Sequence, residues 1–91
     1  MIVATGIMKG NLDKIIGTLQ KKYQWRCRYY NKSVKLYTDV EKKIISLKLS
    51  DIGNHNILVE ASNKGIHNID EDNIIKSCLF DMFNKVMNLD F

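Results

Sequence analysis

The chain has 91 residues, of which 45% are hydrophobic and 26% are charged, and it contains no proline. This is the composition of one folded domain with a thin core, because a chain of this length buries only roughly 60 to 65% of the surface that its unfolded form exposes. That size disfavours a deep catalytic cleft, and no apolar run reaches the roughly 20 residues that cross a bilayer. We therefore expect a single domain over residues 1–91 that is a binding module, with no catalysis, no cofactor and no transmembrane segment.

The N-terminal residues and the charge distribution indicate where the protein works and what it binds. Residues 1–8 lack the basic start and the long apolar stretch of a signal peptide, which predicts an intracellular protein of the cytoplasm or nucleus, not a secreted one. The net charge is +4, and residues 1–45 hold ten Lys and Arg against three Asp and Glu. This asymmetry predicts a surface for a polyanion. The alternative is that the lysines only keep a small domain soluble.

The first predicted elements are a strand and a helix. Residues 1–8 are apolar on both faces, which predicts a strand that is buried on both sides or central in a sheet. Asn11 is suited to cap a helix, and the spacing of Leu12, Ile15, Ile16 and Leu19 predicts one near residues 12–22.

From Trp25 the apolar period changes to two, which predicts a series of antiparallel strands. The expected strands cover residues 25–30, 34–38, 43–50, 57–61 and 66–68, with a polar loop at 51–56. A second helix is expected near residues 72–89, capped by Asp70 or Asp72. The order is β-α-β-β-β-β-α, which predicts an α+β two-layer sandwich: one antiparallel sheet of four to six strands with both helices on one face. Leu19 and Phe83 are expected to be fully buried in the shared core.

Candidate catalytic and metal-binding residues are few. Two cysteines and two histidines are the right number for a zinc site, but Cys27 and Cys78 lack the paired spacing that zinc sites have. We predict no metal site, and we expect both cysteines to be small buried thiols. No glycine-rich phosphate loop or nucleophile motif is present, so no catalytic residue is assigned.

A basic segment with interleaved aromatic residues is the strongest functional signal. Arginine and lysine contact phosphates, and aromatic rings stack on bases or insert between base steps. Alternation predicts that Arg26, Arg28 and Tyr30 project from the open face of the sheet while Trp25, Cys27 and Tyr29 face the helices. The other interpretation is an edge strand whose charges prevent sheet-to-sheet association. The predicted nucleic-acid or anion-binding residues are Lys21, Lys22, Arg26, Arg28, Tyr30 and Lys35.

An open sheet face with exposed apolar residues would also mark a partner surface. The predicted partner surface is on the first strand and consists of Val3, Thr5 and Ile7. A homodimer or another protein partner is expected to cover it.

The element order resembles one repeat of the TATA-box-binding protein fold over nearly the whole chain. Residues 2–5 followed by 11–15 are similar to the first strand and helix of such a repeat, and Arg26-Cys27-Arg28-Tyr29 falls where family members carry a similar basic, aromatic segment. Residues 57–59 with Ser62-Asn63-Lys64-Gly65 look like the strand and turn before the last helix, and residues 86–91 look like its end. The resemblance implies DNA binding in transcription, and the composition suggests a viral transcription factor as one setting.

Departures from the family limit what the resemblance implies. Glu60 and Val34 stand where DNA-kinking repeats place phenylalanines, and Gly6-Ile7-Met8 replaces the asparagine that the family's first strand offers to the minor groove. Binding would therefore depend on phosphate contacts, with little bending. The family protein has two repeats that form a saddle, which implies that a single repeat dimerises or belongs to a larger protein.

Two other functions remain open at this point. The kinase-associated C-terminal domain has a similar element order, and this resemblance implies a basic surface for anionic phospholipids. The third class is a small phage or viral inhibitor that docks on a host protein through its open sheet face.

Overall fold

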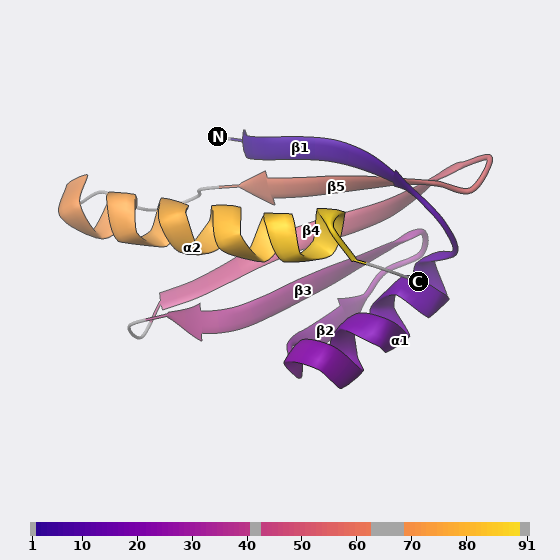
Figure 1. The fold of residues 1–91 in the computed structure, drawn as a ribbon, viewed down its shortest axis with the longest axis horizontal. Helices are drawn as coiled ribbons and strands as arrows, with labels where there is room; N and C mark the ends of the chain where they lie inside the picture. The colour runs from indigo at the N-terminus through magenta and orange to yellow at the C-terminus, as the bar shows by residue number, and fades with distance from the viewer. Residues whose placement is uncertain (1, 41–42, 63–68, 90–91) are drawn as a thin grey trace.

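The computed structural model describes residues 2–40, 43–62 and 69–89. Along the chain it has β1 (Ile2–Lys9), α1 (Leu12–Tyr23), β2 (Arg26–Tyr29), β3 (Ser33–Val40), β4 (Lys43–Gly53), β5 (Asn56–Ser62) and α2 (Ile69–Met87). All strands belong to one five-stranded antiparallel sheet in the order β1-β5-β4-β3-β2. Both helices lie on the same face of this sheet (Figure 1), which confirms the predicted α+β two-layer sandwich.

The core lies between the helices and the sheet. Ile15, Ile16 and Leu19 of α1 are buried, as the predicted helical spacing requires. Alternate residues of β3, β4 and β5 point toward the helices and are also buried, namely Val34, Leu36, Ile45, Leu47, Leu49, Ile57, Val59 and Ala61. The helix α2 completes the core with Ile75, Leu79, Met82 and Val86. Leu19 is buried as predicted, whereas Phe83 is only half-buried at the margin of this core, so its predicted full burial is wrong.

The start of α1 follows the sequence prediction. The Asn11 side chain accepts a hydrogen bond from the backbone N–H of Lys14 at 3.2 Å, which satisfies one of the free donors of the first turn. The helix stops at Gln24, whose φ of 57° places it in the left-handed region. There the chain turns back toward the sheet and enters β2.

A tight hairpin replaces the predicted loop at residues 51–56. The strand β4 continues to Gly53, and β5 already begins at Asn56. Asn54 and His55 have φ values of 56° and 60°, and two consecutive left-handed residues match the right-handed twist of the flanking strands. The sequence prediction missed this turn because histidine is a weaker signal for a left-handed residue than glycine.

Two further predictions about the ends of the sheet and of α2 are wrong. The strand β1 is an edge strand with one face uncovered, whereas its apolar sequence predicted burial on both faces or a central position. The helix α2 begins at Ile69, so Asp70 and Asp72 lie within the helix and not at the position before it, where a capping residue stands. The strand predicted at residues 66–68 lies outside the described residues.

Candidate nucleic-acid interface

The face of the sheet opposite the helices, which we call the open face, carries the candidate site. No described element covers it, because α1 and α2 both pack on the other side. Side chains that alternate with the buried ones in β3, β4 and β5 therefore project from it. The pairing of the strands decides which of these side chains become neighbours.

Three cations lie in one cross-strand row of the open face. Arg28 of β2 is paired with Lys35 of β3, and Lys35 is paired with Lys48 of β4. All three residues are exposed. Directly opposite residues on neighbouring strands have Cβ atoms about 4.5 to 5.5 Å apart, and like charges at that separation destabilise a sheet. We call Arg28, Lys35 and Lys48 the cationic row.

The cationic row ends at β5 and adjoins a hollow of the open face. Beyond Lys48 the row continues to Glu60 of β5 and then to Thr5 of β1, so its positive character ends at β5. Beside Lys35 and Lys48 of the row, the open face has a shallow hollow of about 270 Å³, which these two lysines line together with Tyr30 and Ser33. Tyr30 is held there by its backbone N–H, which donates to the carbonyl oxygen of Ser33 at 2.8 Å. Hydroxyl and ammonium groups around one hollow can donate hydrogen bonds to an anionic oxygen.

Arg26 is on the open face as predicted, but it has a protein partner. Its guanidinium Nη2 lies 2.9 Å from Oδ1 of Asp39 and its Cζ lies 4.7 Å from the centre of the Tyr37 ring. The carboxylate compensates its charge, so Arg26 is less available to a ligand than the cationic row. The pair still fixes the side chain at the exposed edge of the sheet.

Lys21 and Lys22 do not join this surface. They occupy the last turn of α1, on the helix side of the sheet, where a cation interacts favourably with the negative end of the helix dipole. The Lys22 ammonium also lies 5.5 Å from the centre of the Tyr23 ring. The structure thus divides the predicted binding residues between two layers: Arg28 and Lys35 belong to the cationic row, Arg26 and Tyr30 lie near it, and the two helical lysines lie away from it.

Lys48 is the functional candidate that sequence reasoning did not select. Alternation in β4 indicated that Lys48 lies on the opposite side of its strand from Leu47 and Leu49. Nothing in the sequence indicated that it would lie opposite Lys35, because that depends on the β3–β4 register.

Of the predicted partner surface, Thr5 and Ile7 are exposed on the uncovered side of β1, and Ile7 has 58% of its surface exposed. The Val3 side chain lies outside the described residues. Thr5 and Ile7 are near the free edge of the sheet, at the opposite end from β2 and its arginines. The partner surface and the cationic row are therefore separate regions of the open face.

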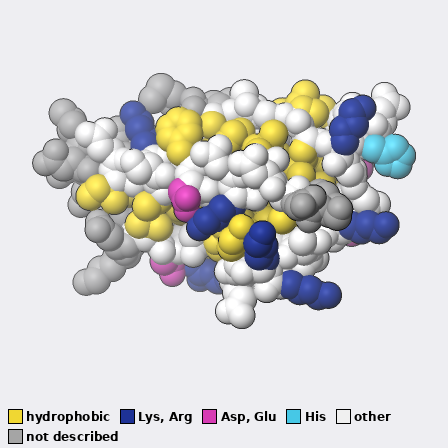
Figure 2. Space-filling view, viewed as in Figure 1, with side chains coloured by type: hydrophobic (Ala, Val, Ile, Leu, Met, Phe, Trp, Pro, Cys, Tyr) yellow, Lys and Arg dark blue, Asp and Glu magenta, His cyan; other side chains and the backbone are white. Residues whose placement is uncertain are grey.

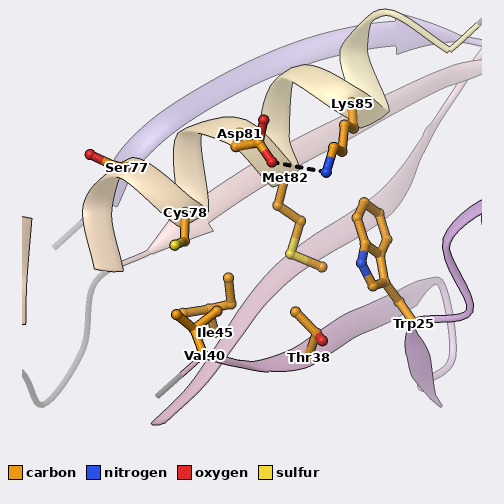
Figure 3. Close-up of a pocket in the computed structure, with 9 residues that line it drawn as sticks. All are labelled: Trp25, Thr38, Val40, Ile45, Ser77, Cys78, Asp81, Met82 and Lys85. Atoms are coloured by element: carbon orange, nitrogen blue, oxygen red, sulfur yellow. Dashed lines mark ion pairs between the residues drawn. The ribbon is translucent and has the colours of Figure 1, made fainter. Parts of the chain in front are cut away.

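The helix layer contains a different hollow, of about 370 Å³, between α2 and the part of the sheet formed by β3 and β4 (Figure 3). Trp25 forms one wall, and Met82 extends from α2 toward Val40 and Ile45 at the bottom. Asp81 and Lys85 form an ion pair of 2.9 Å at its rim, and hydrogen bonding to Asp81 raises the pKa of Lys85. The only carboxylate in the described lining is thus already paired with a cation.

The two thiols lie apart from one another, and among the described residues they belong to no cluster of possible metal ligands. Cys27 and Cys78 are both free and half-buried, and burial raises the pKa of the Cys27 thiol against the opposing effect of a hydrogen bond with Gln20. Within residues 2–40, 43–62 and 69–89, no three His, Cys, Asp or Glu residues converge as metal ligands would. In the same ranges, neither helix combines the length and apolar character needed to cross a membrane.

Comparison with known proteins assigns this chain to no family, so its function is inferred from the geometry of the molecule. No protein-family model matches the sequence, and no curated protein matches it at a significant level.

Proposed function

We propose that the protein is a non-catalytic DNA-binding module that contacts the phosphate backbone through the open face of its sheet, with a role in transcription like that of the TATA-box-binding protein repeat it resembles. The cationic row of Arg28, Lys35 and Lys48 carries this proposal. Three like charges on adjacent strands repel one another in the free protein. A bound polyanion converts that repulsion into attraction, because it places negative charge next to each cation.

The dimensions of the row suit a nucleic-acid backbone. Neighbouring strands are about 4.8 Å apart, so the row extends for roughly 10 Å across three strands. One strand of duplex DNA carries a charge for about every 3.4 Å of helix axis, so the row corresponds to about three nucleotides. The hollow lined by Tyr30 and Ser33 adds hydroxyl donors for phosphate oxygens beside Lys35 and Lys48.

Little on the open face would read a base sequence. Glu60 occupies the position after Lys48 in the row, and its carboxylate repels phosphate and cannot insert between base steps. Val34, the other position at which the resembled family has a wedge, is buried in the core and cannot reach a ligand. We therefore expect similar affinities for different sequences, with little bending of the DNA.

The test measures binding to duplex DNA over a series of salt concentrations. The double substitution Lys35→Gln/Lys48→Gln should lower affinity and reduce the slope of log affinity against log salt by about two units, since each phosphate contact contributes about 0.9. The matched control is Lys21→Gln/Lys22→Gln, which removes the same charge from the helix side and should leave most of the affinity. Equal losses in the two variants would show that only net charge matters and would contradict a specific site.

The same measurement is repeated with single-stranded DNA, and with vesicles of anionic phospholipid, in place of the duplex. Binding of wild-type protein to vesicles but not to DNA would replace the DNA proposal with the phospholipid function. Absence of binding to either polyanion would favour docking on a protein.

A further inference from the structure

The two helices do not cover the whole inner face of the sheet. Val34 and Leu36 of β3 are buried beneath them, but Thr38 and Val40, which alternation places on the same side of the strand, are only half-buried. This part of β3 lines the hollow of about 370 Å³ shown in Figure 3. Its volume lies within the range of small-molecule sites, which is about 300 to 1,000 Å³.

The interior of this hollow is apolar and preformed. Trp25 forms one wall, and its ring stacks on that of Tyr23, with 4.7 Å between the ring centres and 18° between the planes. The thioether of Met82 extends from α2 toward Val40 and Ile45 at the bottom. Aromatic rings and thioether sulfur are favourable neighbours for a further aromatic ring. The hollow therefore suits the aromatic part of a ligand.

A second hollow, of about 320 Å³, adjoins the first along α2, because Asp81 and Lys85 line both. This second hollow is polar, and its other lining residues are Lys22, Tyr23, Asn84 and Asn88. Figure 2 shows hydrophobic surface next to basic and acidic side chains in the middle of the face that carries the helices. An apolar hollow and a polar hollow thus lie side by side.

The polar hollow has a net positive charge. The ammonium groups of Lys22 and Lys85 lie 5.5 and 5.3 Å from the centre of the same Tyr23 ring. Asp81 compensates Lys85 at 2.9 Å, whereas Lys22 forms no ion pair with a described residue. An ammonium group has three N–H donors, so Lys85 can donate to Asp81 and to a ligand at the same time. A carboxylate placed here would accept hydrogen bonds from two cations.

We propose that the two adjoining hollows bind a small aromatic carboxylic acid, with its ring against Trp25 and Met82 and its carboxylate beside Lys22 and Lys85. Two lysines and one aspartate leave one positive charge, which matches one carboxylate. The separate apolar and polar parts match a ring joined to an acid by a short chain. The site lies on the helix side of the sheet, away from the cationic row, so it is independent of DNA binding and is tested without DNA.

Trp25 is the only tryptophan of the chain, so its fluorescence reports directly on the apolar hollow. The probes are phenylbutyrate, phenylbutanol and phenylbutylamine, which share an apolar body and have an anionic, a neutral and a cationic head. Phenylbutyrate should bind with a dissociation constant on the order of 0.1 to 1 mM, and the alcohol about 10-fold more weakly, with the amine weaker still. Thermal unfolding provides a second readout, because a ligand that binds only the folded protein raises the midpoint. Absence of binding at about 10 mM phenylbutyrate, or equal affinities for the acid and the alcohol, overturns the proposal.

A pair of lysine variants tests the polar hollow. Lys22→Gln should weaken phenylbutyrate binding by a factor of about 10 and leave phenylbutanol binding unchanged, because only the acid uses the ammonium group. The matched control is Lys21→Gln, which removes the same charge from the same helical turn but lines neither hollow. It should leave both affinities close to those of the wild type. Equal losses in the two variants would show attraction by net charge alone and would contradict the proposed site.

A second pair of variants tests the apolar hollow. Thr38→Phe places a larger side chain in the hollow and should abolish binding of both the acid and the alcohol. Thr5→Phe makes the same substitution on the open face and should leave binding unchanged. Denaturant unfolding establishes that each variant is folded. Binding of phenylbutyrate to folded Thr38→Phe with wild-type affinity would place the ligand elsewhere and overturn the proposal.

Discussion

The same strands present buried side chains on one face of the sheet and exposed side chains on the other. Ile44 and Ile45 are consecutive in β4, yet 67% of the surface of Ile44 is exposed and only 4% of that of Ile45. On the helix side the strands present almost only aliphatic residues, whereas on the open face they present lysine, arginine, serine and tyrosine together with exposed isoleucines such as Ile7 and Ile44. The helix side thus stabilises the fold by burying aliphatic side chains, whereas the open face places like charges on adjacent strands, an arrangement that is expected to cost stability.

The largest expected effect is a difference in the free energy of unfolding between substitutions of these two adjacent residues, one on each face of the sheet. Ile45→Ala should reduce the free energy of unfolding by about 2 to 5 kcal/mol, because it removes buried methyl groups and leaves a cavity. Ile44→Ala should change it by less than about 1 kcal/mol, the range of strand propensities at an exposed site. Denaturant unfolding of both variants measures the difference. Similar losses would mean that the open face is covered in solution.

A smaller change in the free energy of unfolding, of opposite sign, is expected for a substitution in the cationic row. Lys35 lies between Arg28 and Lys48, so Lys35→Gln removes two repulsive contacts and should increase the free energy of unfolding by roughly 0.2 to 1 kcal/mol. Lys48→Gln is the control, because Lys48 has a repulsive neighbour in Lys35 and an attractive one in Glu60, and its removal should be close to neutral. The comparison is made at low salt without ligand. A destabilised Lys35→Gln variant would show that repulsion among these cations does not destabilise the folded protein.

The smallest expected effect is a dependence of stability on pH, and it comes from two residues on the helix side of the sheet. The pKa values of Cys27 and Lys85 are raised in the folded protein, Cys27 by burial and Lys85 by its hydrogen bond to Asp81. A raised pKa means that the folded state holds the proton more tightly, so both contributions to stability are present below the unfolded pKa and are lost as the pH rises through the folded one. Thermal unfolding should therefore show a lower midpoint above about pH 9 than at neutral pH. Cys27→Ala should remove the part of this loss that begins near the thiol's ordinary pKa.

The local features of the molecule follow from the sequence because they depend on neighbouring residues. Asn11 caps α1, the stripe from Leu12 to Leu19 covers its buried face, and the period-two pattern places Arg26 and Arg28 on the opposite side of their strand from Cys27. These relations require only the repeat of a helix or a strand. The same reasoning correctly predicted the order of the elements and that both helices share one face.

What only the tertiary structure decided is which strands are neighbours and in which register. The apolar sequence of β1 suited a central strand as well as an edge, and the chain uses it as an edge whose inner side is covered by α2. Lys48 became part of the cationic row through its pairing with Lys35, and the two lysines at the end of α1 were separated from that row by the thickness of the sheet. Alternation fixes the side of a strand on which a residue lies, but the partner across the strand depends on long-range pairing and on the turns that set its register.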